Sequence, residues 1–406
     1  MPTGRADHNL IKRLNSALIL NNLLSVSPQS RANLAERTGL NRSTVSSLVS
    51  DLIDQALVRE VGLAGASERG RPGMMLELNP TGGCIVGVEI NVGYATVLVT
   101  DFTARTLWRQ HIEVDEDIPQ DEFLALVEDL IAAGLQAGTA NGLKPLGIGL
   151  GLPGLIDTEN KRLVFAPNLG WRDVSFCDRW EQRFRVPLYV ENDGNASALG
   201  EYYFGVAKGH EDFLFIATGT GLSAGMMLNN HLYRGAGGYA GEIGHIIVES
   251  GGDLCNCGRR GCWETLVSPP AIMRGILHAL NSGAPSIIPD LVGDNLDRLN
   301  MRVVVEAADQ GDQLALDTLL DTALNLGVGI ANLVNIFNPA MIVLGGTLIS
   351  AGDYLLPTIS NIITAEALSA PAGMVALALS SQGTDSCVKG AVALVIDGIV
   401  REPVFT

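Results

Sequence analysis

Four metal-ligand side chains within 18 residues constrain this chain more than any other feature of its sequence. His245 ends the segment Gly-Glu-Ile-Gly-His, and Cys255, Cys257 and Cys262 follow it among glycines. Three thiolates and one imidazole satisfy a tetrahedral site, and glycines permit the tight turns that such a site needs. Because four protein ligands close the coordination sphere, the spacing predicts a structural zinc ion. The alternative is a group of unliganded thiols beside a bystander histidine.

Length and composition exclude several classes of protein. The chain has 406 residues, of which 47% are apolar and 17% charged. This is enough for two or three domains with cores of their own, and it argues against extended disorder or a collagen-like repeat. We find no uncharged apolar run of the ~20 residues that span a bilayer, and no signal peptide around Arg5, Asp7 and His8. Six cysteines in so long a chain are no disulfide framework. We therefore expect a cytoplasmic protein without membrane insertion.

The net charge of −17 is distributed unevenly. Residues 1–78 carry nine Lys and Arg against seven Asp and Glu, whereas the other 328 residues carry 18 against 37. A strongly acidic body repels nucleic acid. A DNA-binding role would therefore have to lie in the mildly basic N-terminal segment.

That N-terminal segment has the pattern of a helix-turn-helix. Helices are expected over 10–24, over 30–37 and after the turn Thr38-Gly39-Leu40, where Asn41 is a good N-cap. In the third helix, apolar residues recur with a helical period and form one buried stripe. The members of this stripe are Val45, Leu48, Val49, Leu52 and Ile53. The alternative is a three-helix bundle with a merely solvated polar face.

The opposite face of the third helix carries small hydroxyl groups and an arginine. Such side chains can reach phosphates and base edges without blocking the major groove. The expected DNA contacts of the helical region are Arg31, Asn41, Arg42, Ser43, Thr44, Ser46 and Ser47.

Two apolar runs after the third helix predict the wing of a winged helix. They cover residues 57–61 and 74–78, and the loop between them contains Arg69-Gly70-Arg71-Pro72. A flat segment of this kind can enter a narrow A·T-rich minor groove, so Arg69 and Arg71 are expected to contact DNA. An ordinary surface turn is the alternative.

The remaining chain alternates short apolar runs with helical stretches, which predicts an α/β fold. Strands are expected at 85–90, 96–100, 146–152, 188–190, 213–217 and 341–344. Helices are expected at 121–133 and at 313–337, where Asn338-Pro339 ends the second one. Residues 282–295 are interpreted as an irregular surface insertion.

The metal-ligand segment resembles the pattern of the ROK family, Gly-Glu-Ile-Gly-His followed by Cys-x-Cys-Gly-x-x-Gly-Cys-x-Glu. That family unites sugar-responsive repressors with sugar kinases on a two-lobed, actin-like ATPase fold. The likeness includes the N-terminal module, which the repressors carry and the kinases lack. Residues 166–171, Ala-Pro-Asn-Leu-Gly-Trp, are similar to those of members of the xylose-repressor or N-acetylglucosamine-repressor type.

The resemblance implies three domains. A winged helix-turn-helix would occupy residues 1–80. A first α/β lobe would occupy 81–195 and be completed by a C-terminal helix at about 386–406. A second α/β lobe, with the zinc site, would occupy 196–385.

The resemblance also implies a sugar site, because several residues match the family's sugar-facing positions. Carboxylates and amides can take paired hydrogen bonds from neighbouring hydroxyl groups. His245 could hold zinc with one ring nitrogen and face the sugar with the other. As isolated features these residues would be turn or surface polar groups. The implied sugar contacts are Gly154, Asn168, Asn192, Asp193, Glu242, His245 and Glu264.

The family's kinases have Asp-x-Gly-Gly-Thr after the first strand, where backbone amides approach the ATP phosphates. This chain has Glu89-Ile90-Asn91-Val92-Gly93-Tyr94 there, with side chains in place of glycines. The second phosphate loop, Thr218 to Gly225, and the pair Gly345-Gly346 are largely kept. Asp193 matches the kinases' general base. We expect no enzyme activity, and Asp193 would be a vestigial base.

We expect the protein to be a sugar-responsive DNA-binding regulator, specifically a repressor of carbohydrate uptake or catabolism genes. A homodimer or homotetramer would bind a palindromic operator and release it when a monosaccharide or sugar phosphate binds. Two alternatives remain at this point. One is an ATP-dependent sugar kinase with an appended DNA-binding module, and the other is a regulator controlled by a protein partner.

Overall fold

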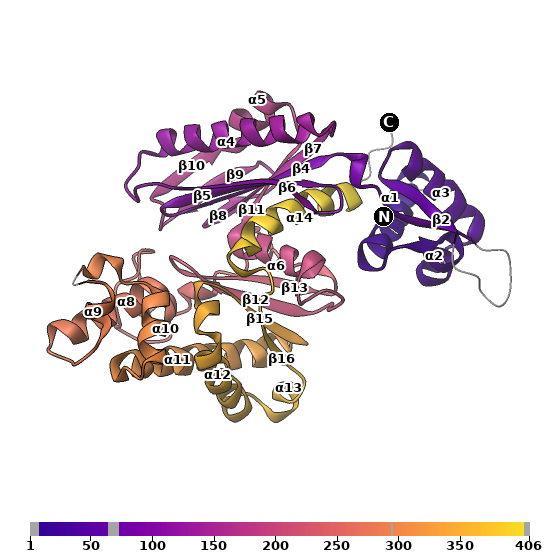
Figure 1. Ribbon diagram of the computed structural model, residues 1–406. Coiled ribbons are helices and arrows are strands. Elements are labelled where there is room, and N and C mark those ends of the chain that lie inside the picture. Colours follow the sequence, from indigo (N-terminus) through magenta and orange to yellow (C-terminus); the bar gives the residue numbers. More distant parts are fainter. Residues whose placement is uncertain (1–7, 64–72, 294, 402–406) are drawn as a thin grey trace.

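The computed structural model describes residues 8–63, 73–293 and 295–401 (Figure 1). A small N-terminal domain sits at the end of a body made of two α/β lobes, and each lobe is built on a five-stranded sheet. The expected α/β class is confirmed.

The N-terminal domain is a winged helix-turn-helix, as expected. Its helices are α1 (His8–Ser25), α2 (Arg31–Thr38) and α3 (Arg42–Asp54). Its sheet has the order β1-β3-β2, with β1 (Gln29–Ser30), β2 (Val58–Leu63) and β3 (Met74–Leu78). The Asn41 side chain accepts the Thr44 N–H (2.8 Å) and so caps α3. The loop with Arg69 and Arg71 lies outside the described residues.

The apolar stripe of α3 forms the core of this domain. Val45, Leu48, Val49 and Leu52 are buried, while Ile53 is half-buried at the edge of the same cluster. Burying side chains of this size stabilises the domain by roughly 1.5–3 kcal/mol each. The opposite face of α3 is therefore the one that solvent or DNA can reach.

The first lobe has a mixed sheet in the order β11-β7-β4-β5-β6. Its strands are β4 (Cys84–Asn91), β5 (Tyr94–Asp101), β6 (Thr106–Glu113), β7 (Pro145–Leu152) and β11 (Leu188–Asn192). A second, three-stranded sheet of β8 (Leu155–Asp157), β9 (Arg162–Ala166) and β10 (Trp171–Ser175) lies beside it. Helix α4 (Gln120–Ala140) covers the outer face of the large sheet, and α5 (Gln182–Phe184) is a single turn before β11.

Helix α4 continues seven residues beyond the expected end at residue 133. Gly134 and Gly138 follow that expected end. Both glycines instead let the helix approach the sheet, since a Cβ at Gly134 would meet Val99 (2.9 Å) and one at Gly138 would meet Cys84 (2.5 Å). The expected end at residue 133 was therefore too early, because these glycines belong to the packed face of the helix.

The second lobe has a sheet in the order β14-β13-β12-β15-β16. Its strands are β12 (Phe213–Thr218), β13 (Leu222–Leu228), β14 (His231–Leu232), β15 (Met341–Gly346) and β16 (Ala376–Leu379). The helices of this lobe are α7 (Glu264–Val267), α8 (Pro269–Asn281), α9 (Ile288–Leu291), α10 (Met301–Asp309), α11 (Gln313–Phe337), α12 (Gly352–Glu366) and α13 (Ser369–Ala372).

Residues 282–295 are not the irregular surface insertion that the sequence suggested. They include the short helix α9, Ile288 belongs to the core of the second lobe, and Val292 is also buried. The interpretation was wrong because the polar residues of the segment hid two apolar anchors.

Helices α6 (Asp193–Phe204) and α14 (Ser386–Arg401) lie between the two sheets (Figure 1). Their backbones touch, since a Cβ at Gly390 would lie 1.9 Å from the Ala196 carbonyl oxygen. Helix α14 also packs against β4 and β7 of the first lobe and against α1 of the N-terminal domain. One continuous apolar cluster therefore joins the N-terminal domain to the helices between the lobes.

Helices α4 and α11 are long and apolar enough to cross a membrane by length and composition alone. In this fold they are packed helices of the two lobes, with 44% and 56% of their most apolar windows buried.

Candidate functional site

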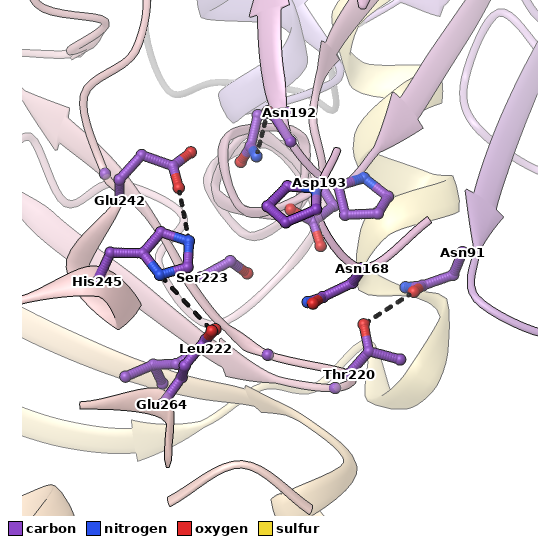
Figure 2. A pocket seen from close by; sticks show the side chains of 16 residues that line it. Asn91, Asn168, Asn192, Asp193, Thr220, Leu222, Ser223, Glu242, His245 and Glu264 are labelled. Carbon is purple, nitrogen blue, oxygen red and sulfur yellow. Dashed lines mark hydrogen bonds and ion pairs between the residues drawn. The ribbon is translucent and has the colours of Figure 1, made fainter. Parts of the chain in front are cut away.

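A polar pocket lies between the lobes, where β11, β7 and the loops around β12 and β13 converge (Figure 2). All seven residues that the family resemblance assigned to a sugar line this pocket. They come from widely separated segments: two loops of the first lobe, the β11–α6 junction, the turn Ile243–His245 and the start of α7. The structure thus places all seven around one pocket.

Asn192 and Asp193 lie at the junction between β11 and α6. Asn192 Oδ1 accepts the Gly194 N–H (2.9 Å), and its Nδ2 donates to the Gly154 carbonyl (3.1 Å). Both ends of this amide are therefore used within the protein, and Asn192 fixes the strand end beside Asp193. Burial raises the pKa of Asp193 to about 6, although the Gly194 N–H (2.8 Å) opposes this rise. Of these two neighbouring side chains, Asp193 is the one whose polar group faces the pocket.

Glu242, His245 and Glu264 form the opposite wall (Figure 2). His245 Nε2 lies 3.8 Å from Glu242 Oε2, and Nδ1 lies 3.5 Å from Glu264 Oε1. Burial raises the pKa of Glu242 to about 7, and the nearby carboxylates of Asp193 and Glu264 add to the rise. Three carboxyl groups therefore share one small space.

The four expected metal ligands lie together behind this wall. The ligand atoms of His245, Cys255, Cys257 and Cys262 are all within 4.8 Å of one another. The Sγ atoms of Cys257 and Cys262 are 3.6 Å apart, and Cys255 Sγ is 3.6 Å from His245 Nδ1. A tetrahedral zinc ion with arms of ~2.3 Å would separate its ligands by about 3.7 Å. The donor set and its spacing therefore fit a bound metal.

The metal-ligand loop also positions two pocket residues, a connection that the sequence did not reveal. The Cys255 thiol donates to Glu264 Oε1 (2.8 Å), and Asn256 Nδ2 donates to Asn168 Oδ1 (2.9 Å). Because His245 Nδ1 faces the thiols while Nε2 faces Glu242, the imidazole can serve the metal and the pocket at once.

The first loop of the cleft is filled by its own side chains. Residues 91–94 form a two-residue hairpin between β4 and β5. The Tyr94 hydroxyl donates to Glu89 Oε1 (2.8 Å), and Asn91 Nδ2 lies 3.2 Å from that hydroxyl. Thr220, from the second loop, donates to Asn91 Oδ1 (3.5 Å), so the two loops meet across the cleft (Figure 2).

Glu89 is a buried carboxyl group at the base of this loop. Burial raises its pKa to about 7, and the charges of Asp193 and Asp385 raise it further, whereas bonds from Tyr94 and the Val388 N–H oppose the rise. Val388 lies in the first turn of α14. The Glu89 carboxyl group thus accepts a hydrogen bond from the Val388 N–H at the start of α14.

The glycines retained in the second loop have structural reasons. A Cβ at Gly221 would lie 2.7 Å from Glu264 Oε2, and one at Gly346 would lie 2.0 Å from the Thr218 carbonyl oxygen. Gly346 also has a φ of 76°. Gly346 is therefore required by the backbone of this lobe, whether or not a nucleotide binds, whereas a side chain at Gly221 would displace the Glu264 carboxylate.

An ion pair joins the lobes on the other side of the β11–α6 junction. Arg234, after β14, lies with its Nε 2.7 Å from Oε2 of Glu191, which is only 1% exposed. Sequence reasoning missed this pair because the two residues are 43 positions apart and neither stands in a recognisable motif.

The polar face of α3 is open. Arg42, Ser43, Ser46 and Ser47 are exposed and Thr44 is half-buried. The Asn41 side chain is used in capping α3, and Arg31 pairs with Glu60 on β2 (2.9 Å). Two of the expected DNA contacts in this region are charged, Arg31 and Arg42. Of these two, Arg42 has no ion-pair partner among the described residues.

Fold and site together define a class of protein: a two-lobed, sugar-kinase-like body that carries a winged helix-turn-helix. The chain belongs to the ROK family, whose model matches residues 85–398.

Two curated relatives match almost the whole chain. The xylose repressor of Bacillus subtilis (strain 168) is 33% identical over 395 residues, which are 97% of each chain. The DNA-binding transcriptional dual regulator NagC of Escherichia coli (strain K12) is 31% identical over 372 residues, covering 91% of this chain and 90% of NagC.

Two solved structures separate the repressor and kinase branches. A ROK family transcriptional regulator, a homologue of the E. coli MLC protein, matches with a TM-score of 0.83 and 27% identity over 96% of this chain and 98% of its own. A ROK family glucokinase from Streptomyces griseus, in complex with glucose and AMPPNP, matches with a TM-score of 0.68 and 32% identity. The glucokinase match covers 98% of that enzyme but 76% of this chain.

Proposed function

We propose that the protein is a sugar-responsive transcriptional repressor of carbohydrate genes. The observation that carries this proposal is the joining of two parts in one chain. A winged helix-turn-helix with an open polar face packs directly on a body whose interlobe pocket is lined by the residues that resemble the family's sugar-facing positions. The relatives that match the chain from end to end are regulators, and the glucokinase match covers only 76% of it.

A series of packed helices connects the pocket to the N-terminal domain. Asp193 begins α6, α6 packs on α14, and α14 packs on α1 of the N-terminal domain. A monosaccharide or sugar phosphate bound between the lobes would favour their closed arrangement and shift the N-terminal domains of a homodimer or homotetramer relative to each other. The ligand can shift this equilibrium only by its difference in affinity for the two states.

The metal in this proposal is zinc with a structural role. The donor set of one imidazole and three thiolates is typical of structural zinc and leaves no open coordination position. The ion would hold the loop whose Asn256 donates to Asn168. As a thiolate ligand, Cys255 would no longer donate a hydrogen bond to Glu264. His245, Cys255, Cys257 and Cys262 would be its ligands, and the reducing cytoplasm is where such thiolates persist.

A sugar kinase is the second candidate, because one observation favours it. Asp193, the residue that matches the general base, has a pKa raised to about 6, which suits proton abstraction near neutral pH. Against this stands the filled first loop, where Asn91 and Tyr94 occupy the place of phosphate-binding backbone. A coupled assay for ADP with a sugar panel separates the two candidates.

In the operator complex, α3 would lie in the major groove, with Arg42, Ser43, Ser46 and Ser47 toward bases and phosphates. Arg69 and Arg71 of the wing would lie in a flanking minor groove. If Arg42 reads a base, Arg42→Ala should weaken operator binding by about 1–3 kcal/mol and relax preference at one position per half-site. If Arg42 touches phosphate only, the loss should be uniform across sequences and the salt slope should fall by about one.

The test is a titration of operator variants at two salt concentrations, with and without sugar. Arg302→Ala, an exposed arginine of α10 in the acidic body, is the matched control and should bind the operator like wild type. Wild-type affinity of Arg42→Ala for every sequence would show that the polar face of α3 is only a solvated face.

A further inference from the structure

We infer that Glu191 and Arg234 form a clamp that positions the second-lobe wall of the pocket against the first-lobe wall. Neither residue is among those that line the pocket. What the clamped pocket binds rests on the proposed function, but the clamp itself can be tested without a ligand. It follows from the contacts that one buried carboxylate makes with both lobes.

Glu191 is a buried carboxylate at the end of β11, and its two oxygens hold three donors. Oε1 accepts the Asn192 N–H (3.0 Å) and Nδ2 of Asn195 (3.1 Å), both at the start of α6. Oε2 accepts Nε of Arg234 (2.7 Å), which follows β14 in the second lobe. Because Glu191 is only 1% exposed, water cannot readily replace a lost partner. The carboxylate therefore links the β11–α6 junction to the second lobe.

Arg234 is the cation that compensates this buried charge. A hollow behind the junction is lined by Glu191, Arg234 and one other basic residue, Lys161. Lys161 pairs instead with Glu181 (2.5 Å). Removing the Arg234 guanidinium would therefore leave the Glu191 carboxylate buried and unpaired, which proteins tolerate poorly.

Arg234 also begins a glycine-rich loop that ends at a pocket residue. Residues 235–241 are Gly-Ala-Gly-Gly-Tyr-Ala-Gly, and Glu242 follows them. The Ala240 N–H donates to the Arg234 carbonyl (3.0 Å), so the two ends of the loop meet at its base. Glycines leave a backbone with little stiffness of its own. The loop must therefore be held at its ends if Glu242 is to keep one position.

Glu191 holds the far end of this loop as well, through Asn195. A Cβ at Gly241 would lie 4.0 Å from Asn195 Oδ1 and 2.3 Å from the Ala224 carbonyl oxygen. Gly241 has a φ of 100°, a conformation that favours glycine. The backbone just before Glu242 thus lies directly against α6 and β13. One carboxylate therefore fixes the start of the loop by an ion pair and supports its end through a buried amide.

The clamp sets the spacing between the two walls of the pocket. Asp193 lies two residues after Glu191, and Glu242 lies eight residues after Arg234. Asp193 and Glu242 face the pocket from opposite sides (Figure 2). A binding site keeps its affinity when its groups are held within ~0.5 Å of their working positions. Glu191 and Arg234 are therefore positioning residues that act on a ligand through the two pocket carboxyl groups.

Limited digestion with chymotrypsin tests the clamp without a ligand. The exposed Tyr239 in the loop is a cleavage site for this protease. In the full-length, metal-loaded protein, Arg234→Met should raise the rate of cleavage after Tyr239 roughly tenfold, because a loop freed at one end opens more often. Arg234→Lys should restore most of the protection, since an ammonium group can take the place of Nε beside Glu191. Arg302→Met, the same substitution at an exposed arginine of α10, is the matched control.

Calorimetry then measures what the clamp does for binding. The probes are neutral pentoses and hexoses, including D-xylose, D-glucose and N-acetyl-D-glucosamine, and their phosphate esters. For the probe that binds the wild type, Arg234→Met should weaken affinity roughly tenfold. Arg234→Lys should recover most of this loss, and Arg302→Met should show none. Recovery by lysine separates positioning from packing, because lysine restores the charge of arginine but not its shape.

A second variant keeps the test decisive if Arg234→Met does not fold. Glu191→Gln combined with Arg234→Met removes both charges and keeps side chains of similar length, so no buried charge is left unpaired. This double variant should fold and should still show faster cleavage after Tyr239 and weaker binding of the probe.

The outcomes separate the clamp from the proposed function. If the Arg234 variants are cleaved and bind the probe like wild type, the clamp is wrong and the proposed function stands. Faster cleavage with unchanged affinity, or a loss of affinity that Arg234→Lys does not recover, would overturn the positioning role. If no probe binds the wild type or releases the operator while Arg234→Met is cleaved faster, the clamp is supported and the sugar response is wrong.

Discussion

The two sides of the interlobe cleft use their polar side chains differently. We name them the sugar side and the phosphate side, after the ligands of the proposed function and of its kinase alternative. On the sugar side, Asp193, Glu242 and Glu264 present carboxyl groups to an open space, and a metal-ligand loop fixes their surroundings. On the phosphate side, Glu89, Asn91 and Tyr94 bond to one another and to the second loop. The polar groups of the sugar side surround an open space, whereas those of the phosphate side form hydrogen bonds with one another.

This difference shows how binding and catalysis can be separated in one fold. Phosphoryl transfer needs free backbone amides and cations around a phosphate, because the protein contributes positioning and charge stabilisation. In this chain side chains fill the space beside the first loop, while the three carboxyl groups on the other side line an open pocket.

The largest expected effect lies behind the sugar side. Cys262→Ser should release the metal and destabilise the body on the order of 5 kcal/mol, because metal binding is part of the folding energy of such a site. Metal analysis and thermal unfolding measure both. Cys177→Ser, a half-buried cysteine outside the cluster, is the control and should keep the metal. A wild-type protein that is stable and free of metal would contradict the prediction.

The next effect concerns the sugar itself. Asp193→Asn keeps an acceptor for the Gly194 N–H but removes the charge, so sugar affinity should fall on the order of 10- to 100-fold. Operator binding without sugar should stay near wild type, because Asp193 is remote from the exposed face of α3. Asp129→Asn, on the exposed side of α4, should change neither. Lost operator binding with normal sugar binding would show that the site is wrongly assigned.

A smaller effect concerns pH on the phosphate side. The Glu89 pKa rises from an ordinary 4.5 to about 7 on folding, so between these values the folded protein holds a proton that the unfolded chain has lost. The free energy of unfolding should therefore decrease as pH rises through this window. Glu89→Gln keeps the acceptor for Tyr94 but cannot ionise, so the variant should lack this decrease.

The expected difference between Glu89→Gln and wild type is near zero at pH 4.5. At pH 8 the variant should be more stable by about 1–3 kcal/mol. Denaturant unfolding across this pH range measures it, with Glu113→Gln, an exposed carboxylate on β6, as the control. Parallel pH profiles for wild type and Glu89→Gln would mean that Glu89 keeps an ordinary pKa.

The smallest effect should come from restoring glycines to the first loop. Asn91→Gly with Val92→Gly removes two side chains, but Tyr94 and Glu89 remain, so ATP affinity should change less than tenfold. Sugar-dependent ADP release should stay below the roughly 1 s⁻¹ of ordinary kinases in both proteins. Turnover at such a rate by the wild type would reverse the comparison and establish the kinase alternative.

Much of the N-terminal domain could be predicted because its signals are local. The Asn41 cap and the apolar stripe of α3 depend on residues within one or two helical turns. Helix α4 shows the limit of such reasoning, since Gly134 and Gly138 look like a stop until the sheet beneath them is known. The same limit applies to the buried anchors Ile288 and Val292.

The candidate site divides in the same way. The metal ligands lie within 18 residues, so their spacing could be recognised directly. The bonds from Asn256 to Asn168 and from Arg234 to Glu191 join segments 88 and 43 residues apart, and no pattern in either segment indicates its partner.

The sequence by itself determined the metal-ligand set, the helix caps and the periodicities of the two kinds of domain, because each depends on neighbouring residues. Only the tertiary structure decided that three carboxyl groups face one pocket without a cation, and that Glu89 and Asn192 satisfy the helix starts beside it. The physical reason is that the charge and solvation of a site are sums over distant segments. Those sums exist only once the chain has brought the segments together and excluded water from between them.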